Sequence, residues 1–358
     1  MSLRARIAAI LSRDAARLLE ESRRREAALS VLLESLAEGV IALDANGSVV
    51  RMNRSSHELL GVGDAPPIPV DRLPPDPALR EAIRAAIGGR VREPVELRLG
   101  HRVVAANAHP LPGGGAAIAL FDLTALRRLE TIRRDFVANV SHELRTPLTA
   151  ITGYAETLGD ETLPLDDRRH FTRTLLANAE RMRRIIDDLL DLSRIESGGW
   201  TPEPARVDVA LAAGDALSPA RSAAHAKGLG LTLAIDPRAP TVDADPTAVR
   251  QILSNLTENA VRHTERGQVT VFTARGEGGS WLGVRDTGIG IPAEHLPRVF
   301  ERFYRVDAGR SRAAGGTGLG LAIVRHLAEA HGGRAEVESA VGQGTTVRVF
   351  FPERRQIG

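Results

Sequence analysis

The sequence predicts a multidomain protein with a mixed α+β domain, a pair of long helices, and a domain in which strands and helices alternate. Its 358 residues are too many for one small core. Two long amphipathic segments flank the turn-like stretch GDETLPLDD near the middle of the chain. From about residue 205 onward, apolar runs of strand length alternate with helical patterns.

Composition excludes several classes of function. The chain has no cysteine, so disulfides, thiolate zinc sites and cysteine nucleophiles are excluded. No apolar run approaches the roughly 18 to 20 residues of a membrane span, so membrane association is not supported and we expect a cytoplasmic protein. An N-terminal anchor that had been removed would leave no trace in this sequence.

The charge pattern argues against direct nucleic-acid binding. The pI is about 9.6 although the formal net charge is only +2. Lys227 is the only lysine, and the arginines are interleaved with Asp and Glu in a chain without a groove-reading motif. We therefore expect no nucleic-acid partner.

The first 124 residues predict a helix followed by a mixed domain. Residues 1–29 have the pattern of an amphipathic helix that pairs with another helix, or alternatively lies on a membrane surface. Residues 30–124 begin with two alternating segments joined by Asn46-Gly47, a hairpin signal in which both turn positions take positive φ. Two short helices and three further strands follow.

Residues 125–199 predict a helical hairpin. The second helix carries apolar residues three or four apart from Phe171 to Leu192, a stripe that a single pair of helices cannot bury. We expect two chains to dimerise into a four-helix bundle. Pro147 in the first helix predicts either a kink or a break, and the apolar pattern that continues beyond it favours a kink.

The last domain contains two polar motifs, each of which is a weak signal by itself. Asn255 and Asn259 lie four apart on one face of a predicted helix, where amide oxygens suit Mg²⁺ although capping or packing is the default. Asp286 follows a strand and precedes two glycines, so a buried carboxylate there suits an exocyclic amine. Backbone can approach a ligand closely at Gly288 and Gly290.

A glycine-rich loop before an amphipathic helix predicts an anion cradle. The loop runs from Gly315 to Gly320, and its backbone N–H groups and the helix N-terminus can face phosphates. A dinucleotide fingerprint would need a parallel βαβ unit, which the pattern lacks. Because Lys227 is the only lysine and lies in AHAKGLG, a Walker A motif and a eukaryotic-type protein kinase are both excluded.

Taken in order, these motifs resemble the bacterial two-component sensor histidine kinases. The stretch FVANVSHELRTPLT is followed by the two asparagines, the Asp286 loop, FERFYR at 300–305, the glycine loop and GQGTT at 342–346, which match the family's H, N, G1, F, G2 and G3 boxes. The amino-acid sequence of these motifs is most similar to that of the PhoR-like, phosphate-regulon branch of the family. Residues 30–124 resemble a PAS sensor domain.

The resemblance implies a domain organisation and a set of ligands. It implies a coiled-coil helix (1–29), a PAS-like domain (30–124), a HisKA dimerisation and phosphotransfer domain (125–199), an ATP-binding α/β sandwich of the GHKL (Bergerat) type (200–354) and a tail (355–358). ATP and Mg²⁺ are the implied cofactors, with Asn259 as the metal ligand and residues from about 297 to 316 as a lid. The residues implied at ATP are Asn255, Asn259, Arg262, His263, Asp286, Gly288, Gly290, Arg305, Gly316, Thr317, Gly318, Leu319, Gly320 and Thr345.

Three residues of the octet SHELRTPL are predicted to act on the phosphoryl group. Neutral imidazole can attack a γ-phosphoryl group in line, and His142 would be that nucleophile through Nε2. By resemblance, Glu143 accepts the Nδ1 proton and Thr146, one helical turn later, orients the water that dephosphorylates the partner.

The expected partners are a second copy of the chain and a separate response regulator, of the OmpR/PhoB type by resemblance. Two other functions stay open at this point: a GHKL-type ATPase and a catalytically silent nucleotide-binding scaffold. The ATPases place a water-activating Glu four residues before the metal-binding Asn, where this chain has Asn255.

Overall fold

The structure, a computed structural model, describes residues 3–160, 162–197, 199–306 and 316–353, with side chains from Arg17 onward except those of Asp215 and Pro219. The chain divides into two compact units, Met1–Arg134 and Asp135–Gly358, and the division falls within one long helix. Each unit has its own hydrophobic core.

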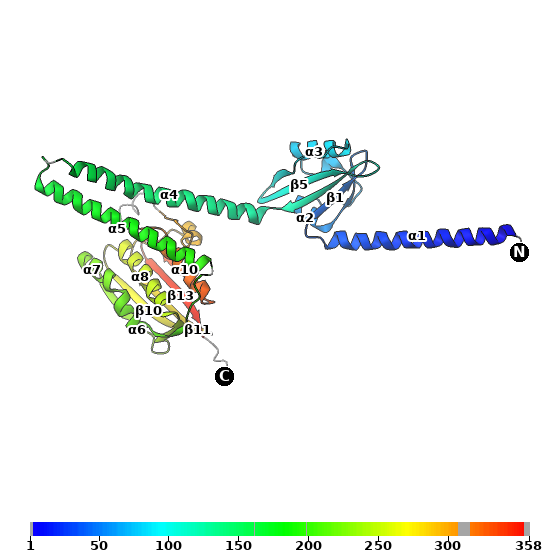
Figure 1. Cartoon of the computed structure of the whole chain (residues 1–358). Coiled ribbons are helices and arrows are strands. Elements are labelled where there is room, and N and C mark those ends of the chain that lie inside the picture. Colours follow the sequence, from blue (N-terminus) through cyan, green and yellow to red (C-terminus); the bar gives the residue numbers. More distant parts are fainter. Residues whose placement is uncertain (1–2, 161, 198, 307–315, 354–358) are drawn as a thin grey trace. The chain divides into compact units, whose positions relative to one another are not determined.

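The N-terminal unit is a helix followed by an antiparallel sheet (Figure 1). Helix α1 runs to Ser35, six residues beyond the predicted end at 29. The sheet has the strand order β3-β2-β1-β6-β5-β4, and α2 and α3 pack on one of its faces, which is compatible with the predicted PAS-like domain. The bounds are α1 Leu3–Ser35, β1 Gly39–Leu43, β2 Ser48–Met52, α2 Arg54–Leu60, β3 Ile68–Pro69, α3 Pro77–Ile87, β4 Val95–Leu99, β5 Arg102–Pro110 and β6 Ala116–Asp122.

The β1–β2 hairpin forms as predicted, but its turn differs from the prediction. Gly47 has a φ of 84°, whereas Asn46 does not have the positive φ that a type I′ turn requires. The Asp44 carboxylate instead accepts hydrogen bonds from the backbone N–H groups of Asn46 and Ser48, at 2.9 and 2.8 Å. Hydrogen bonds from the turn backbone to the Asp44 side chain therefore stabilise this turn, in place of the predicted Asn-Gly conformation.

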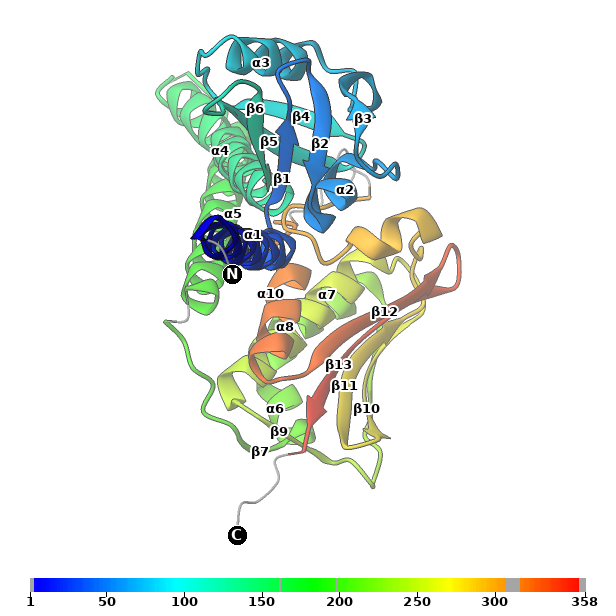
Figure 2. The ribbon, with the colours of Figure 1, turned by 90° about the vertical axis from the view of Figure 1, so that its right-hand side faces the viewer.

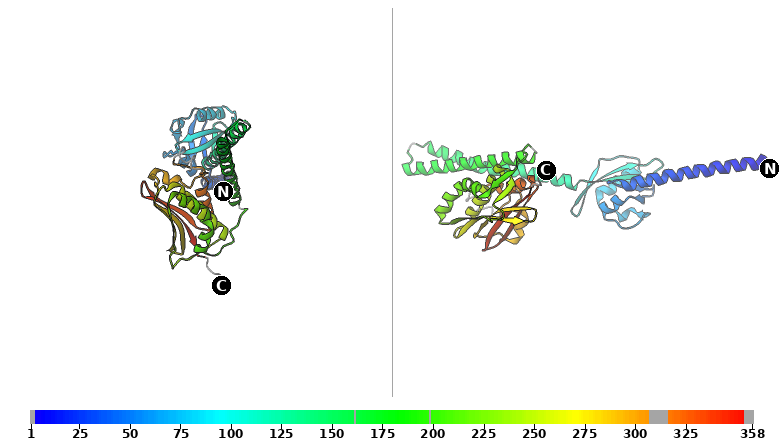
Figure 3. Two further views of the ribbon diagram at one scale, coloured as in Figure 1. Left: turned by 90° about the vertical axis from the view of Figure 1, so that its left-hand side faces the viewer. Right: turned by 90° about the horizontal axis from the view of Figure 1, so that it is seen from below.

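Two long antiparallel helices follow, α4 (Thr124–Leu158) and α5 (Leu165–Glu196), and Figures 1 and 3 show them side by side. Helix α4 continues through Pro147, whose side chain is buried, so a helix break is the wrong alternative. Both helices leave large apolar side chains exposed. These include Leu129, Ile132, Val137 and Leu148 on α4 and Leu176, Ile186 and Leu190 on α5.

The rest of the C-terminal unit is a five-stranded sheet with helices on one face (Figure 2). The strand order is β12-β13-β11-β10-β8, in which only the β8–β10 pair is parallel. The bounds are β7 Ala205–Asp208, α6 Val209–Ala216, α7 Ser218–Lys227, β8 Gly230–Ala234, β9 Thr241–Ala244, α8 Pro246–His263, β10 Gln268–Gly276, β11 Gly279–Asp286, α10 Gly320–Ala330, β12 Arg334–Ala340 and β13 Gly344–Pro352.

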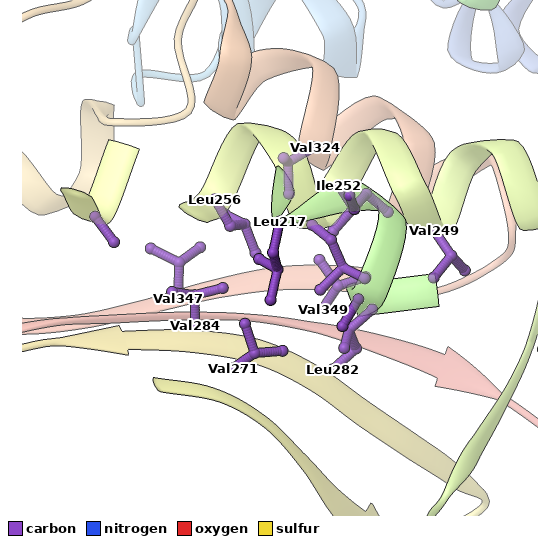
Figure 4. Packing of buried hydrophobic residues seen from close by; sticks show 14 of the residues in the cluster. Leu217, Val249, Ile252, Leu256, Val271, Leu282, Val284, Val324, Val347 and Val349 are labelled. Atoms are coloured by element: carbon purple, nitrogen blue, oxygen red, sulfur yellow. The ribbon is translucent and has the colours of Figure 1, made fainter. Parts of the chain in front are cut away.

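The core of this unit lies between the helices and the sheet (Figure 4). Val249, Ile252 and Leu256 point from α8 towards the sheet, at the helical spacing of three and four. Alternate residues of the strands, such as Leu282 and Val284 on β11, face them. This packing fixes which face of α8 is left for ligands.

Among the described residues, no helix is long and apolar enough to cross a membrane.

We expect Leu253→Ala on α8 to destabilise the protein by about 2–5 kcal/mol, because it removes a buried side chain from a packed core. The matched control is Leu211→Ala on α6, since Leu211 is 75% exposed. That change should stay within roughly 0.5 kcal/mol. Urea unfolding of both variants measures the difference, and equal losses of stability would contradict the core described here.

Candidate functional site

Helix α8 has one buried face and one polar face. Asp245 caps its N-terminus by accepting from the N–H groups of Thr247 and Ala248 at 2.7 and 3.2 Å, and Pro246 occupies the first turn. The face opposite the core carries Asn255, Asn259 and Arg262, as the sequence predicted.

The two asparagine amides have open hydrogen-bonding positions. The Nδ2 atom of Asn255 is buried and has no hydrogen-bond partner among the described residues, and its Oδ1 lies 3.4 Å from where a Cβ on Gly320 would be. The side chain of Asn259 makes no hydrogen bond to the described part of the chain. A buried donor without a partner costs free energy, so Asn255 fits a site completed by a ligand.

Asp286 ends β11 with one oxygen engaged and the other open. Its Oδ1 accepts from the backbone N–H groups of Gly288 at 2.8 Å and Thr345 at 3.2 Å. Oδ2 makes no hydrogen bond to another described residue. Burial raises the pKa of this carboxyl, and the two N–H groups oppose that shift. The open oxygen can accept a hydrogen bond from an exocyclic amine.

The glycines after Asp286 are needed for contact with protein backbone. A Cβ on Gly288 would lie 2.4 Å from the carbonyl oxygen of His263, and a Cβ on Gly290 would lie 2.0 Å from that of Ala340. The sequence predicts that the backbone approaches a ligand at these positions, but the nearest atoms belong to the backbone at the ends of α8 and β12. The loop therefore packs between these two elements of the fold.

The glycine loop is fixed to the FERFYR segment. Phe303 has a φ of 61°, and its N–H donates to the carbonyl of Gly318 at 2.8 Å. A Cβ on Gly318 would lie 2.8 Å from Cα of Phe303, so only glycine allows this approach. Gly320 then opens α10, after the buried Leu319. The N-terminus of α10 thus lies where the sequence predicted an anion cradle.

Two guanidinium groups converge beside the start of this loop. A Cβ on Gly316 would lie 3.1 Å from Nη1 of Arg262 and 3.4 Å from Nη2 of Arg305. Burial lowers the pKa of Arg262, and the charges of Arg184 and Arg305 act in the same direction. Like charges held together in a partly desolvated place are stabilised by an anion.

His263 contributes its backbone to the site. Its carbonyl accepts from the N–H of Ile289 at 3.3 Å, which joins the end of α8 to the Asp286 loop. Burial lowers the pKa of its imidazole, with Arg262 adding to the effect, so the ring is neutral near pH 7. Its predicted side-chain contact with ATP stays a prediction.

His142 lies exposed on α4, as the prediction that it accepts a phosphoryl group requires. Thr146, one turn later, is also exposed, and its hydroxyl donates to the carbonyl of His142 at 3.2 Å. That hydroxyl can still accept a hydrogen bond from water.

Glu143 is held by arginines from two other elements. Its carboxylate accepts from Nη2 of Arg181 on α5 at 2.9 Å and forms an ion pair with Nη1 of Arg305 at 3.5 Å. The structure shows no hydrogen bond between Glu143 and His142 among the described side chains. Arg305 thus lies beside Gly316 and also contacts the neighbour of His142.

Several residues of α5 that sequence reasoning missed contact the sandwich. The hydroxyl of Thr317 donates to Asp188 at 2.8 Å, and the amide of Gln251 donates to Asp191 at 2.7 Å. Glu196 pairs with Arg302 and lies 3.2 Å from Nε2 of His326. The three acidic residues lie at positions 188, 191 and 196 of α5. From the sequence, charged residues at such a spacing predict a solvent-exposed helix face, so these contacts gave no signal.

The predicted lid at about 297–316 is described only in part, because residues 307–315 lie outside the described residues.

The site fits ATP and Mg²⁺. The open Asp286 oxygen suits the adenine amine, the Arg262 and Arg305 guanidinium groups suit phosphates, and the Asn259 amide supplies a neutral oxygen of the kind that Mg²⁺ binds. The unpartnered Asn255 amide is buried beside Gly320.

Two family models match the chain. The model "His Kinase A (phospho-acceptor) domain" matches residues 132–198, and "Histidine kinase-, DNA gyrase B-, and HSP90-like ATPase" matches residues 244–355. The first match covers most of α4 and all of α5, and the second covers α8 and the strands and helices that follow it.

Two relatives align with most of this chain. The chain is 36% identical over 330 residues to the phosphate regulon sensor protein PhoR of Pseudomonas aeruginosa, covering 88% of this chain and 72% of that protein. It is 30% identical to the sensor protein SrrB of Staphylococcus aureus, covering 90% of this chain but only 55% of that protein. The chain belongs to the bacterial two-component sensor histidine kinases and is an ATP-dependent protein-histidine kinase.

Solved structures support the fold. Histidine kinase ThkA, solved in complex with response regulator protein TrrA, aligns at a TM-score of 0.51 and 20% identity over 90% of this chain and 98% of that chain. Histidine kinase AdeS of Acinetobacter baumannii aligns at a TM-score of 0.50 and 23% identity over 60% of this chain and 98% of that chain.

We expect Asp188→Asn to raise the unfolding temperature at pH 7 by about 2–4 °C, which corresponds to roughly 1 kcal/mol in a unit of this size. Burial raises the pKa of Asp188 from its ordinary 3.8 to about 6. Because the pKa of the folded state is the higher one, the charged carboxylate destabilises this arrangement above pH 6, and the penalty disappears as the pH falls to about 4. The amide oxygen of the variant can still accept from Thr317.

Thermal unfolding of the full chain between pH 4 and 8 measures this effect, with Asp187→Asn as the exposed control on the same helix. The gain of Asp188→Asn should shrink at low pH. A variant less stable than the parent protein at pH 7 would contradict the stated cause.

Proposed function

We propose that this kinase transfers the γ-phosphoryl group of ATP to Nε2 of His142 and passes it to an aspartate of a separate response regulator. One observation carries the proposal: Arg305 lies beside Gly316, at the proposed phosphate end of the nucleotide site, and pairs with Glu143, the neighbour of His142. A single side chain thus bridges the proposed donor and acceptor sites.

The chemistry follows from the side chains that meet there. The Nε2 lone pair forms the N–P bond while the bond from the γ-phosphorus to the bridging oxygen breaks and ADP leaves. Positive charge develops on the imidazole, and a carboxylate beside it can take or stabilise the Nδ1 proton. Glu143 has that role in the proposal, and it has to leave Arg181 or Arg305 first, because both hold it here.

The residues of α8 and β11 would hold the nucleotide. Asn259 would bind Mg²⁺, which neutralises phosphate charge when bound, and Asn255 would lie near the phosphates. Asp286 would accept from the adenine amine through its open oxygen, and Arg262 would contact phosphate as a planar fork.

Two observations argue against a GHKL-type ATPase as the alternative. The position of the water-activating glutamate is Asn255, an amide that cannot serve as a base at neutral pH. The nearby Glu258 accepts a hydrogen bond from Ser254 at 2.9 Å, along its own helix. Transfer to a protein nucleophile therefore fits this site better than attack by water.

Dimerisation and signal input complete the proposal. The exposed apolar residues of α4 and α5 support a four-helix bundle between two copies of the chain. We infer a PAS-like sensor function for residues 30–124 from the six-stranded sheet and its helices. A phosphate-responsive regulator of the OmpR/PhoB type is supported by the name of the Pseudomonas relative, and the ThkA complex supports a response regulator as partner.

We expect the phosphorylated full chain to transfer its label to one or a few response regulators within seconds to minutes, and to most others much more slowly. The test uses the purified, labelled protein against the complete set of regulators of its host. Replacing the acceptor aspartate of the preferred regulator by asparagine should abolish transfer. A label that reaches no regulator, or that reaches the asparagine variant equally well, would contradict the proposal.

We expect Thr146→Ala to slow the loss of phosphate from the phosphorylated regulator by about tenfold or more, because the residue would position the attacking water. Autophosphorylation should change much less. The matched control is Thr149→Ala, since Thr149 is also exposed on α4 and its hydroxyl donates to its own helix at 3.0 Å. Equal dephosphorylation by the parent and the Thr146 variant would exclude this role.

A further inference from the structure

The only lysine of the chain packs against the C-terminal end of α8, the helix that carries the proposed nucleotide site. Lys227 is one of 47 Lys and Arg residues and is the last residue of α7. Its Nζ donates to three backbone carbonyls, those of Val261 at 2.7 Å, Arg262 at 3.0 Å and Thr264 at 3.2 Å. All three belong to the last turn of α8 or to its C-cap.

This contact completes the C-terminus of α8. The last four carbonyls of a helix have no partner within the helix, and they carry its partial negative charge. Here Ala260 accepts from the hydroxyl of Thr264 at 2.7 Å, and His263 accepts from the N–H of Ile289 at 3.3 Å. The ammonium of Lys227 donates hydrogen bonds to the two carbonyls between these, those of Val261 and Arg262. Each of the last four carbonyls of α8 therefore has a partner outside the regular helix pattern.

A lysine suits this place better than an arginine. An ammonium has three donors on one atom and can direct all of them to carbonyls that surround a point. The donors of a guanidinium lie in a plane and are spread over three nitrogens. Three carbonyl oxygens within 3.2 Å of one nitrogen match the first geometry.

The turn that Lys227 holds positions two parts of the nucleotide site. Arg262, whose carbonyl accepts from Nζ, directs its guanidinium to Gly316 at the start of the glycine loop. The next carbonyl, that of His263, anchors Ile289 in the loop that follows Asp286. A turn that frays would displace the proposed phosphate contact and the proposed adenine contact together.

We propose that Lys227 is a positioning residue for ATP binding, which acts by fixing the C-terminal turn of α8. The inference rests on the nucleotide site proposed above. Lys227 acts through Arg262 and the Asp286 loop, so its loss raises the KM for ATP more than it lowers kcat.

Lys227→Met should raise the KM for ATP in autophosphorylation, or the Kd of Mg-ATP, by about tenfold or more. Losses of this size are typical when a residue that orients the ligands of a metal site is replaced. The kcat should change less than about threefold. Lys227→Arg should recover only part of the affinity. The matched control, Arg221→Met, removes another basic side chain of α7 that makes no ion pair with the described residues, and it should leave the KM unchanged.

The absence of cysteine allows a second test in the folded protein. Lys227→Cys introduces the only thiol of the chain. Alkylation with 2-bromoethylamine then adds an ammonium on a side chain of nearly the same length, whereas iodoacetamide adds a neutral amide. The ammonium should restore the affinity for ATP to within about threefold of the parent protein, and the amide should not.

An unchanged KM in Lys227→Met, full recovery in Lys227→Arg, or equal recovery with both alkylating reagents would overturn the inference. A wrong assignment of the nucleotide site would give a different result, because Asn259→Ala would then leave the affinity for ATP unchanged. If only the inference about Lys227 is wrong, Asn259→Ala still weakens ATP binding.

Discussion

The structure of the ATP-binding domain depends on the packing of α8 across the sheet. Val249, Ile252 and Leu256 have to face the strands, because burying them supplies much of the free energy that holds the layers together. Once that face is buried, the helix has only one orientation in which Asn255 and Asn259 can face a ligand. The hydrophobic core therefore sets the direction of the polar residues, and the caps at Asp245 and Lys227 set where the helix begins and ends.

The second constraint is the set of charged contacts that α4 and α5 make with each other and with the sandwich. Glu143 is shared by Arg181 and Arg305, and Asp188 holds the hydroxyl of Thr317 in the glycine loop. Each contact engages a residue that the proposed chemistry needs in another role. In the proposed reaction, the ion pair at Glu143 has to open before the carboxylate can serve the imidazole. The half-buried Asp188 has to move away from the loop before phosphates with the same charge can approach it.

Much of this architecture could be predicted from the sequence, since its signals are local. Helical spacing predicted α4, α5, α8 and α10, and alternation predicted five of the six strands of the N-terminal sheet. The family resemblance implied Asn255, Arg262 and Arg305 as nucleotide-binding residues, and the structure brings these three side chains to the glycine loop. The turn at Asn46 was predicted wrongly, because the Asp44 carboxylate offered the backbone a different set of hydrogen bonds.

What the sequence could not supply were contacts between residues far apart in the chain. Asp188 and Thr317 are 129 positions apart, and Lys227 and Val261 are 34 apart. Nothing in the local pattern of either residue indicates its partner, because an acidic residue on a helix is usually solvated and a lone lysine usually lies on the surface. The same holds for Gly288 and Gly290, whose need for glycine comes from backbone carbonyls of other elements.

The most direct test of phosphoryl transfer to His142 is the chemical form and position of the phosphate after the full chain is incubated with Mg²⁺ and γ-³²P-ATP. Phosphorylation of the imidazole predicts a label that is lost in acid and stable in alkali, as a phosphoramidate is. It also predicts that the label is absent from His142→Ala and retained by His170→Ala, a change of another exposed histidine in the bundle. An acid-stable label, or one that persists in His142→Ala, would contradict phosphoryl transfer to His142.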